Sequence, residues 1–171
     1  MKILIAYASK TGSAKKCSEM LAAELDGFDV DVKDLRFESP DLSGYDFAVI
    51  GGGIRMGMLN KYVKSFFRIA DSRLSEIRYG LFISCASVSQ EEITRFFSAG
   101  FTPEQLSGAA FTLSFGGELN PENLKGLDKY IITAMAKDET RPQPKILSEN
   151  ILRAASLIKK EAEVYDKEGN H

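Results

Sequence analysis

The sequence contains few of the residues that usually carry catalysis by side chains alone. Its single histidine is His171, the last residue, it has no tryptophan, and its two cysteines are Cys17 and Cys85. Histidine is a common general base and metal ligand. Because the one histidine is at the last position, the body of the chain offers no His-based triad, imidazole proton relay or zinc-binding Cys/His spacing. We therefore expect no metal site, assign no catalytic side chain, and expect a bound cofactor to carry any reaction.

Long apolar segments and an excess of one charge are also absent. Lys and Arg total 22 against 24 Asp and Glu, a formal charge of −2, so there is no bulk electrostatic argument for binding nucleic acid. The apolar run at residues 1–7 is too short for a transmembrane segment, and polar residues follow it at once, unlike in a signal peptide. Two cysteines form no disulfide framework, so we expect a cytoplasmic protein with reduced thiols.

The apolar pattern predicts a single α/β domain over residues 1–171. Strands are expected at 2–7, 30–32, 47–50, 79–84 and 109–115, and helices at 14–25, 59–70, 90–97 and 148–165, with a further helix start at Thr102. Because the strands are continuously apolar, we expect a parallel sheet covered by helices on both faces. Residues 117–147 exceed a simple connection and contain a helical pattern, which predicts an inserted helical segment.

Three loops follow predicted strands at the carboxyl edge, where open parallel sheets bind ligands. The first, residues 9–13, combines hydroxyls, a glycine and a helix start, which suit a phosphate or an ordinary capped turn. The second, residues 51–58, has four glycines and predicts either close backbone approach to a flat ligand or a flexible connection. In the third, residues 84–88, small residues leave space for a ligand or fit a turn, and Cys85 is more typical of a small buried group than of a reactive thiol.

These loops and their context resemble the flavodoxin family over nearly the whole chain. Ser9-Lys10-Thr11-Gly12-Ser13-Ala14 is similar to the family's S-x-T-G-x-T loop for the phosphate of flavin mononucleotide (FMN), with Ala14 in place of the last threonine. The resemblance implies FMN as cofactor and a flavodoxin-like three-layer sandwich, with a five-stranded parallel sheet in the order 2-1-3-4-5. Because Ala14 lacks a hydroxyl, the resemblance implies weaker phosphate binding or compensation by Ser13.

The residues that the resemblance implies for cofactor binding come from all three loops. They are Ser9, Lys10, Thr11, Gly12, Ser13, Ala14, Gly52, Gly53, Ile54, Arg55, Met56, Gly57, Ser84, Cys85, Ala86 and Ser87.

Two departures separate the chain from the electron-carrying members of the family, which are strongly acidic and usually place the flavin ring between aromatic side chains. The second and third loops contain no aromatic residue. Residues 50–57, followed by a helix with Phe66 and Phe67, are instead similar to the menaquinone-dependent protoporphyrinogen oxidase group, and the segment after Gly116-Gly117, with Asp128-Lys129 inside it, sits where that group carries extra sequence. This resemblance implies an FMN-dependent oxidoreductase for a small substrate such as a porphyrinogen or quinone.

Two other functions remain open: a one-electron carrier for a redox protein, and a flavin-free domain that only binds partners. The near-neutral charge argues against the carrier, because such proteins usually dock through an acidic patch. Ala14 and the lack of ring-stacking aromatics keep the flavin-free alternative open. Residues 124–137 are open to several interpretations: a cover over the flavin, a contact with a membrane face, a dimer contact or, as an apolar stripe more often indicates, core packing. The oligomeric state is therefore not predicted.

Arg55 suggests a hypothesis about the flavin potential. A cation about 4 Å from the ring favours the anionic reduced flavin by roughly 4 kcal/mol at an effective dielectric of about 20, before desolvation. Such a contact suits two-electron chemistry with an organic substrate. The alternative is that Arg55 points into solvent.

Overall fold

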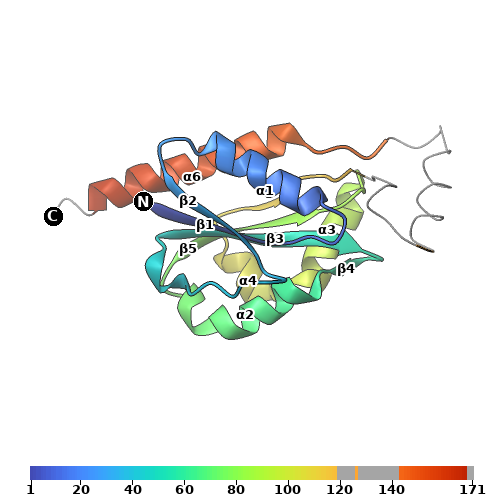
Figure 1. Ribbon diagram of the computed structural model, residues 1–171, viewed down its shortest axis with the longest axis horizontal. Helices are drawn as coiled ribbons and strands as arrows, with labels where there is room; N and C mark the ends of the chain where they lie inside the picture. Colours follow the sequence, from blue (N-terminus) through green and yellow to red (C-terminus); the bar gives the residue numbers. More distant parts are fainter. Residues whose placement is uncertain (119–125, 127–142, 169–171) are drawn as a thin grey trace.

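A parallel sheet forms the centre of the molecule. The computed structural model describes residues 1–118, 126 and 143–168. The parallel strands are β1 (Lys2–Ala8), β2 (Asp29–Asp34), β3 (Phe47–Arg55), β5 (Arg78–Ser84) and β6 (Thr112–Ser114), in the order β2-β1-β3-β5-β6 (Figure 1). The two-residue strand β4 (Met58–Leu59) pairs antiparallel with β3. The parallel strands therefore have the predicted order 2-1-3-4-5, and β4 adds a sixth strand that the sequence pattern did not predict.

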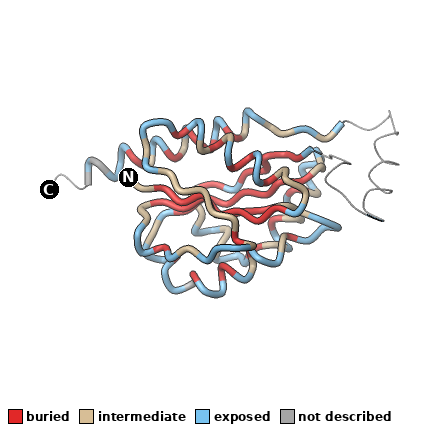
Figure 2. Tube along the Cα trace, viewed as in Figure 1, coloured by how far each residue is buried: buried red, intermediate tan, exposed pale blue. Residues whose placement is uncertain are grey.

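Helices cover both faces of the sheet. In Figure 1, α1 (Ser13–Glu24) and α6 (Ser148–Glu168) lie on one face, and α2 (Lys61–Leu74), α3 (Gln90–Gly100) and α4 (Pro103–Gly108) lie on the other, with a 3-10 turn at Leu42–Gly44. Alternate residues of β1 enter the two cores, Ile3 and Ile5 beneath α1 and α6, and Leu4 and Ala6 facing α2 and α3. Both cores are buried and consist mainly of apolar side chains, which explains why the strands are continuously apolar (Figure 2).

Side-chain caps decide where three helices begin. The side chain of Asn60 accepts from the backbone N–H of Tyr62 at the start of α2, and that of Ser89 accepts from Glu92 in α3. Thr102 and Gln105 form a capping box at α4. Such caps each contribute about 1 kcal/mol. Helix α2 therefore begins after Asn60 rather than at the predicted residue 59, which belongs to β4.

Strand β3 is longer than the predicted 47–50, because its glycines are strand residues rather than a loop. A Cβ on Gly51 would lie 2.1 Å from the carbonyl oxygen of Phe82, and one on Gly52 would lie 2.8 Å from that of Ala8. Close packing against the neighbouring strands therefore requires glycine at both positions, and the second loop shrinks to a tight turn after Arg55.

The end of the sheet leads into the predicted insertion. Strand β6 is shorter than the predicted 109–115. An isolated antiparallel bridge between Gly116 and Ile146 joins the chain on either side of the insertion. The helix expected within 117–147 lies outside the described residues. Within the described ranges, no helix is long and apolar enough to cross a membrane.

Candidate functional site

The three loops meet at the carboxyl edge of the sheet. In the register of the strands, Ala8 lies beside Gly52, and Gly53 lies beside Ser84, so the chain leaves three adjacent strands at nearly the same level. The Ser84 hydroxyl donates to Oγ of Ser13 over 3.2 Å, which links the third loop to the first. The structure thus brings together the loop segments that the sequence analysis selected.

The first loop leaves the start of α1 without a side-chain cap. The capping residue is Gly12, at φ 92°, a left-handed conformation that favours glycine. Its own N–H donates to the buried Ser9 Oγ over 3.0 Å, which holds the loop in shape. Because no side chain of the described residues caps α1, the N–H groups of its first turn can bind another acceptor, and the helix dipole favours an anion there.

Ser13 has a hydroxyl that joins three segments of the chain. Its Oγ accepts from Ser84 and from the backbone N–H of Glu118, the latter over 3.0 Å. Because both bonds are accepted, the proton of Ser13 is left for an acceptor of its own. The Glu118 carboxylate also forms an ion pair with Lys16, whose Nζ donates to both carboxylate oxygens over 3.0 Å. Residues 117–118 therefore lie against the first turn of α1.

Residues 117–118 belong to the site but were missed by sequence reasoning. A Cβ on Gly117 would lie 3.2 Å from the Cys85 backbone and 3.3 Å from Ser13 Oγ, so a larger residue would crowd both loops. Glu118 and Ser13 are separated by 105 residues, and no local pattern predicts that contact. The Gly116-Gly117 pair was the only signal in the sequence.

Ala14 is a core residue of α1. Its side chain is completely buried with Cys17 and Leu21 on the face of α1 that packs on the sheet. Only the backbone of Ala14 therefore belongs to the uncapped helix start.

The second loop is a hairpin between β3 and β4. Met56 and Gly57 form its turn with φ values of 51° and 75°, and two positive φ values are typical of a type I′ turn. Met56 and Met58 are 80% and 63% exposed, so they present apolar side chains to solvent beside an exposed Arg55. A Cβ on Gly53 would have no neighbouring atom within 4 Å, so this backbone is open to a flat ligand.

The third loop begins buried and ends at the surface. Ser84 and Cys85 are buried, Ala86 and Ser87 are half-buried, and the Cys85 N–H donates to the Gly116 carbonyl over 3.0 Å. Burial raises the pKa of the Cys85 thiol above its usual value, although contacts with Ser114 and Ser87 oppose the shift. A neutral, buried thiol is a poor nucleophile, which favours the packing interpretation of Cys85.

The family model described as "Flavodoxin domain" matches residues 4–145. A comparison with curated proteins gives no match.

Among solved structures, the chain is similar to two oxidised flavodoxins of Bacillus cereus, both at TM-score 0.48. Flavodoxin 1 is 17% identical, over 81% of this chain and 99% of that one, and flavodoxin 2 is 24% identical, over 80% and 95%. A flavoprotein of Lactobacillus acidophilus in complex with FMN is 17% identical at TM-score 0.45, over 66% of this chain and 90% of that one. Because the family model spans most of the sequence and the strand order agrees with it, the chain belongs to the flavodoxin domain family.

Proposed function

We propose that the chain is an FMN-dependent oxidoreductase and that the first loop holds the FMN phosphate. The observation that carries the proposal is the start of α1, where no side chain in the described part of the chain accepts from the backbone N–H groups. The Ser13 proton adds a donor, and Lys10 places a positive charge in the same loop. These donors fit a dianionic phosphate better than a neutral group.

We assign the flavin ring to the edge formed by the second and third loops. FMN supplies hydride and electron transfer when bound. Gly53 offers open backbone, and the exposed Met56 and Met58 offer an apolar surface for a flat ring or substrate. Ala86 and Ser87 are small enough to leave space on the other side of that edge.

The substrate that we propose is a small organic molecule, with a porphyrinogen as donor and a quinone as acceptor. Two electrons and two protons leave the donor and arrive on the quinone, which becomes a quinol. The apolar hairpin and the formal charge of only −2 support an organic substrate over docking through an acidic patch. We also propose that residues 1–171 form one domain, with residues 117–147 inserted at this edge of the sheet.

Cofactor binding is tested by titrating the full chain with FMN and with riboflavin, while flavin fluorescence is recorded. We expect saturable quenching by the protein with FMN and much weaker quenching with riboflavin, because only FMN carries the phosphate. In Lys10→Glu the reversed charge should weaken FMN binding roughly tenfold and leave riboflavin unchanged. Lys160→Glu, on the exposed side of α6, is the matched control. Absence of FMN binding at millimolar concentration would refute the proposal and favour a flavin-free partner-binding domain.

The substrate class is tested separately, with the FMN-loaded protein, a porphyrinogen and a water-soluble naphthoquinone under anaerobic conditions. We expect quinone consumption that requires the protein, FMN and the porphyrinogen together. If FMN binds but no quinone is consumed, the proposed substrates are wrong and FMN binding stands.

A further inference from the structure

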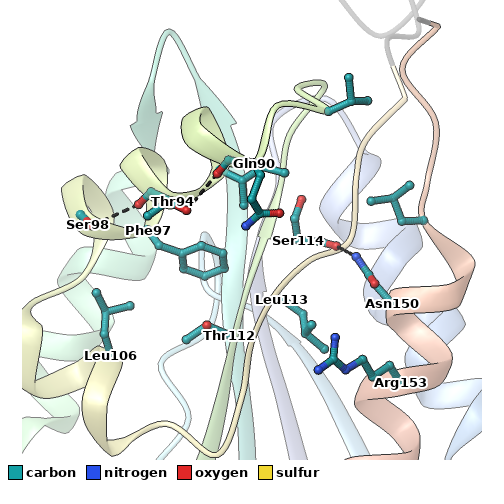
Figure 3. Close-up of a pocket in the computed structure, with 13 residues that line it drawn as sticks. Gln90, Thr94, Phe97, Ser98, Leu106, Thr112, Leu113, Ser114, Asn150 and Arg153 are labelled. Carbon is teal, nitrogen blue, oxygen red and sulfur yellow. Dashed lines mark hydrogen bonds between the residues drawn. The ribbon is translucent and has the colours of Figure 1, made fainter.

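A cleft lies along the edge of β6 that faces away from β5. It has a volume of about 570 Å³, within the usual range for small-molecule sites, and lies between α3, α4, β6 and α6 (Figure 3). Its apolar walls come from Ile93 and Phe97 of α3, Leu106 of α4 and Leu113 of β6. Apart from Val88, the last residue of the third loop, its lining residues lie outside the three loops of the candidate FMN site.

The open edge of the sheet forms the back of this cleft. Strand β6 is the last strand of the described sheet. On the side of β5, the Phe111 carbonyl accepts a hydrogen bond from the backbone N–H of Leu81, and the Phe115 N–H donates to the Ile83 carbonyl. In a parallel strand the intervening residues turn their backbone groups the other way, so those of Thr112 and Ser114 face the cleft. The Asn150 amide already donates to the Ser114 carbonyl over 2.7 Å and closes that end of the edge. The cleft is therefore too short for strand addition by a long peptide and suits a small molecule.

One cation, Arg153, is among the described residues that line this cleft, and polar side chains line it beside the apolar ones: Gln90, Thr94, Ser98, Thr112, Ser114 and Asn150. Arg153 of α6 lines the cleft, and in Figure 3 its guanidinium points from the helix toward Leu113 while the ring of Phe97 points in from α3. Within the described part of the chain, Arg153 has neither an ion pair nor a side-chain hydrogen bond. A guanidinium is always charged and matches a carboxylate with two parallel hydrogen bonds.

We propose that the cleft between α3, β6 and α6 binds a small carboxylic acid with a flat apolar body. The carboxylate pairs with Arg153, and the body lies over Leu113 against Phe97 and Ile93. The open N–H of Thr112 supplies a further donor at the sheet edge. Val88, the last residue of the third loop, also lines the cleft, so the acid binds next to the candidate FMN site but against α3, β6 and α6.

The probe is 2-naphthoate, added to the full chain with FMN at saturation so that the flavin site is not open to it. Backbone amide NMR shifts follow its position. We expect saturable shifts confined to β6, the facing side of α3 and the first turns of α6. The neutral naphthalene-2-carboxamide should bind roughly tenfold more weakly, because it lacks the charge that pairs with Arg153.

Arg153→Gln removes the charge at an exposed position and should weaken 2-naphthoate binding roughly tenfold, with little change for the carboxamide. Lys160→Gln loses the same charge elsewhere on α6 and should bind 2-naphthoate as the unchanged chain does. The proposal is overturned if 2-naphthoate causes no shifts at β6, or if Arg153→Gln binds it equally well. Because the readout is on β6 rather than on the flavin, these outcomes are independent of whether FMN binds.

Discussion

At the scale of single residues, Arg55 is the cation that we propose acts on a bound flavin. Its side chain is exposed, so the higher dielectric of solvent applies rather than the value near 20 used for a partly buried pair. A contact at 4 Å is then worth about 1 kcal/mol instead of about 4.

Replacing Arg55 with Ala should therefore make the two-electron potential of bound FMN more negative by about 20 mV, the equivalent of about 1 kcal/mol. The measurement is a redox titration against dyes of known potential. Arg68→Ala, which removes an exposed cation on α2 away from the carboxyl edge, should leave the potential unchanged. An unchanged potential in Arg55→Ala would mean that this cation does not act on the flavin.

Because the Ala14 side chain is buried, a threonine at this position of the motif would affect packing. Ala14→Thr would restore the family pattern, but the added atoms must enter a fully buried site between α1 and the sheet. We expect destabilisation by about 1–3 kcal/mol and no tighter FMN binding. Thermal unfolding and an FMN titration check both parts, at about 2–4 °C per kcal/mol for a chain of this size. Tighter binding by the variant would show that the threonine hydroxyl reaches the phosphate.

At the scale of elements, the hairpin of β3 and β4 is strained at one residue. Met56 has φ 51°, the only non-glycine residue with positive φ among those described. A side chain in this conformation costs roughly 1 kcal/mol, whereas asparagine tolerates it and Asn-Gly is the preferred pair in type I′ turns.

Met56→Asn should thus stabilise the flavin-free protein by up to about 1 kcal/mol, seen in urea unfolding as a higher midpoint at unchanged m-value. Met58→Asn is the control. It replaces another exposed methionine, but one in the extended backbone of β4, so it should give no such gain in stability. Equal effects of the two substitutions would rule out turn strain as the cause.

At the scale of the whole molecule, ion pairs along β2 link stability to pH. Burial by itself raises the pKa of Asp34, but its hydrogen bonds and charge interaction with Arg36 outweigh burial and hold that pKa below the usual value. Arg36 contacts both carboxylate oxygens, at distances of 2.6 to 3.1 Å.

A carboxyl whose pKa is lower in the folded than in the unfolded state stabilises the fold above its unfolded pKa, near 3.9, and this contribution is lost as the pH falls through the folded pKa. The stability difference between the unchanged chain and Asp34→Asn should be constant near pH 7 and shrink below about pH 4. Urea unfolding across this range provides the measurement. When Arg36 is also replaced with Gln, the effect of Asp34→Asn on stability should depend less on pH. If the pH dependence is unaltered, a group other than Arg36 lowers the pKa of Asp34.

The sequence pattern was enough to predict the layers and the parallel sheet, whereas the phosphate loop at residues 9–13 stays a prediction. Hydrophobic period and helix caps are local, so the buried β1, the capping residue Ser89 and the loop after Ala8 can be recognised within a few residues of chain. The order of the parallel strands followed from the family resemblance, which the matching family model supports.

The contacts between residues of the candidate site depend on the tertiary structure. Glu118 reaches Ser13 across 105 residues, and Gly51 is required by a carbonyl on the neighbouring strand. Arg153 faces Phe97 only because β6 ends the described sheet between α3 and α6. These relations depend on which segments pack together, and residue type and spacing along the chain contain no information about contacts between distant elements.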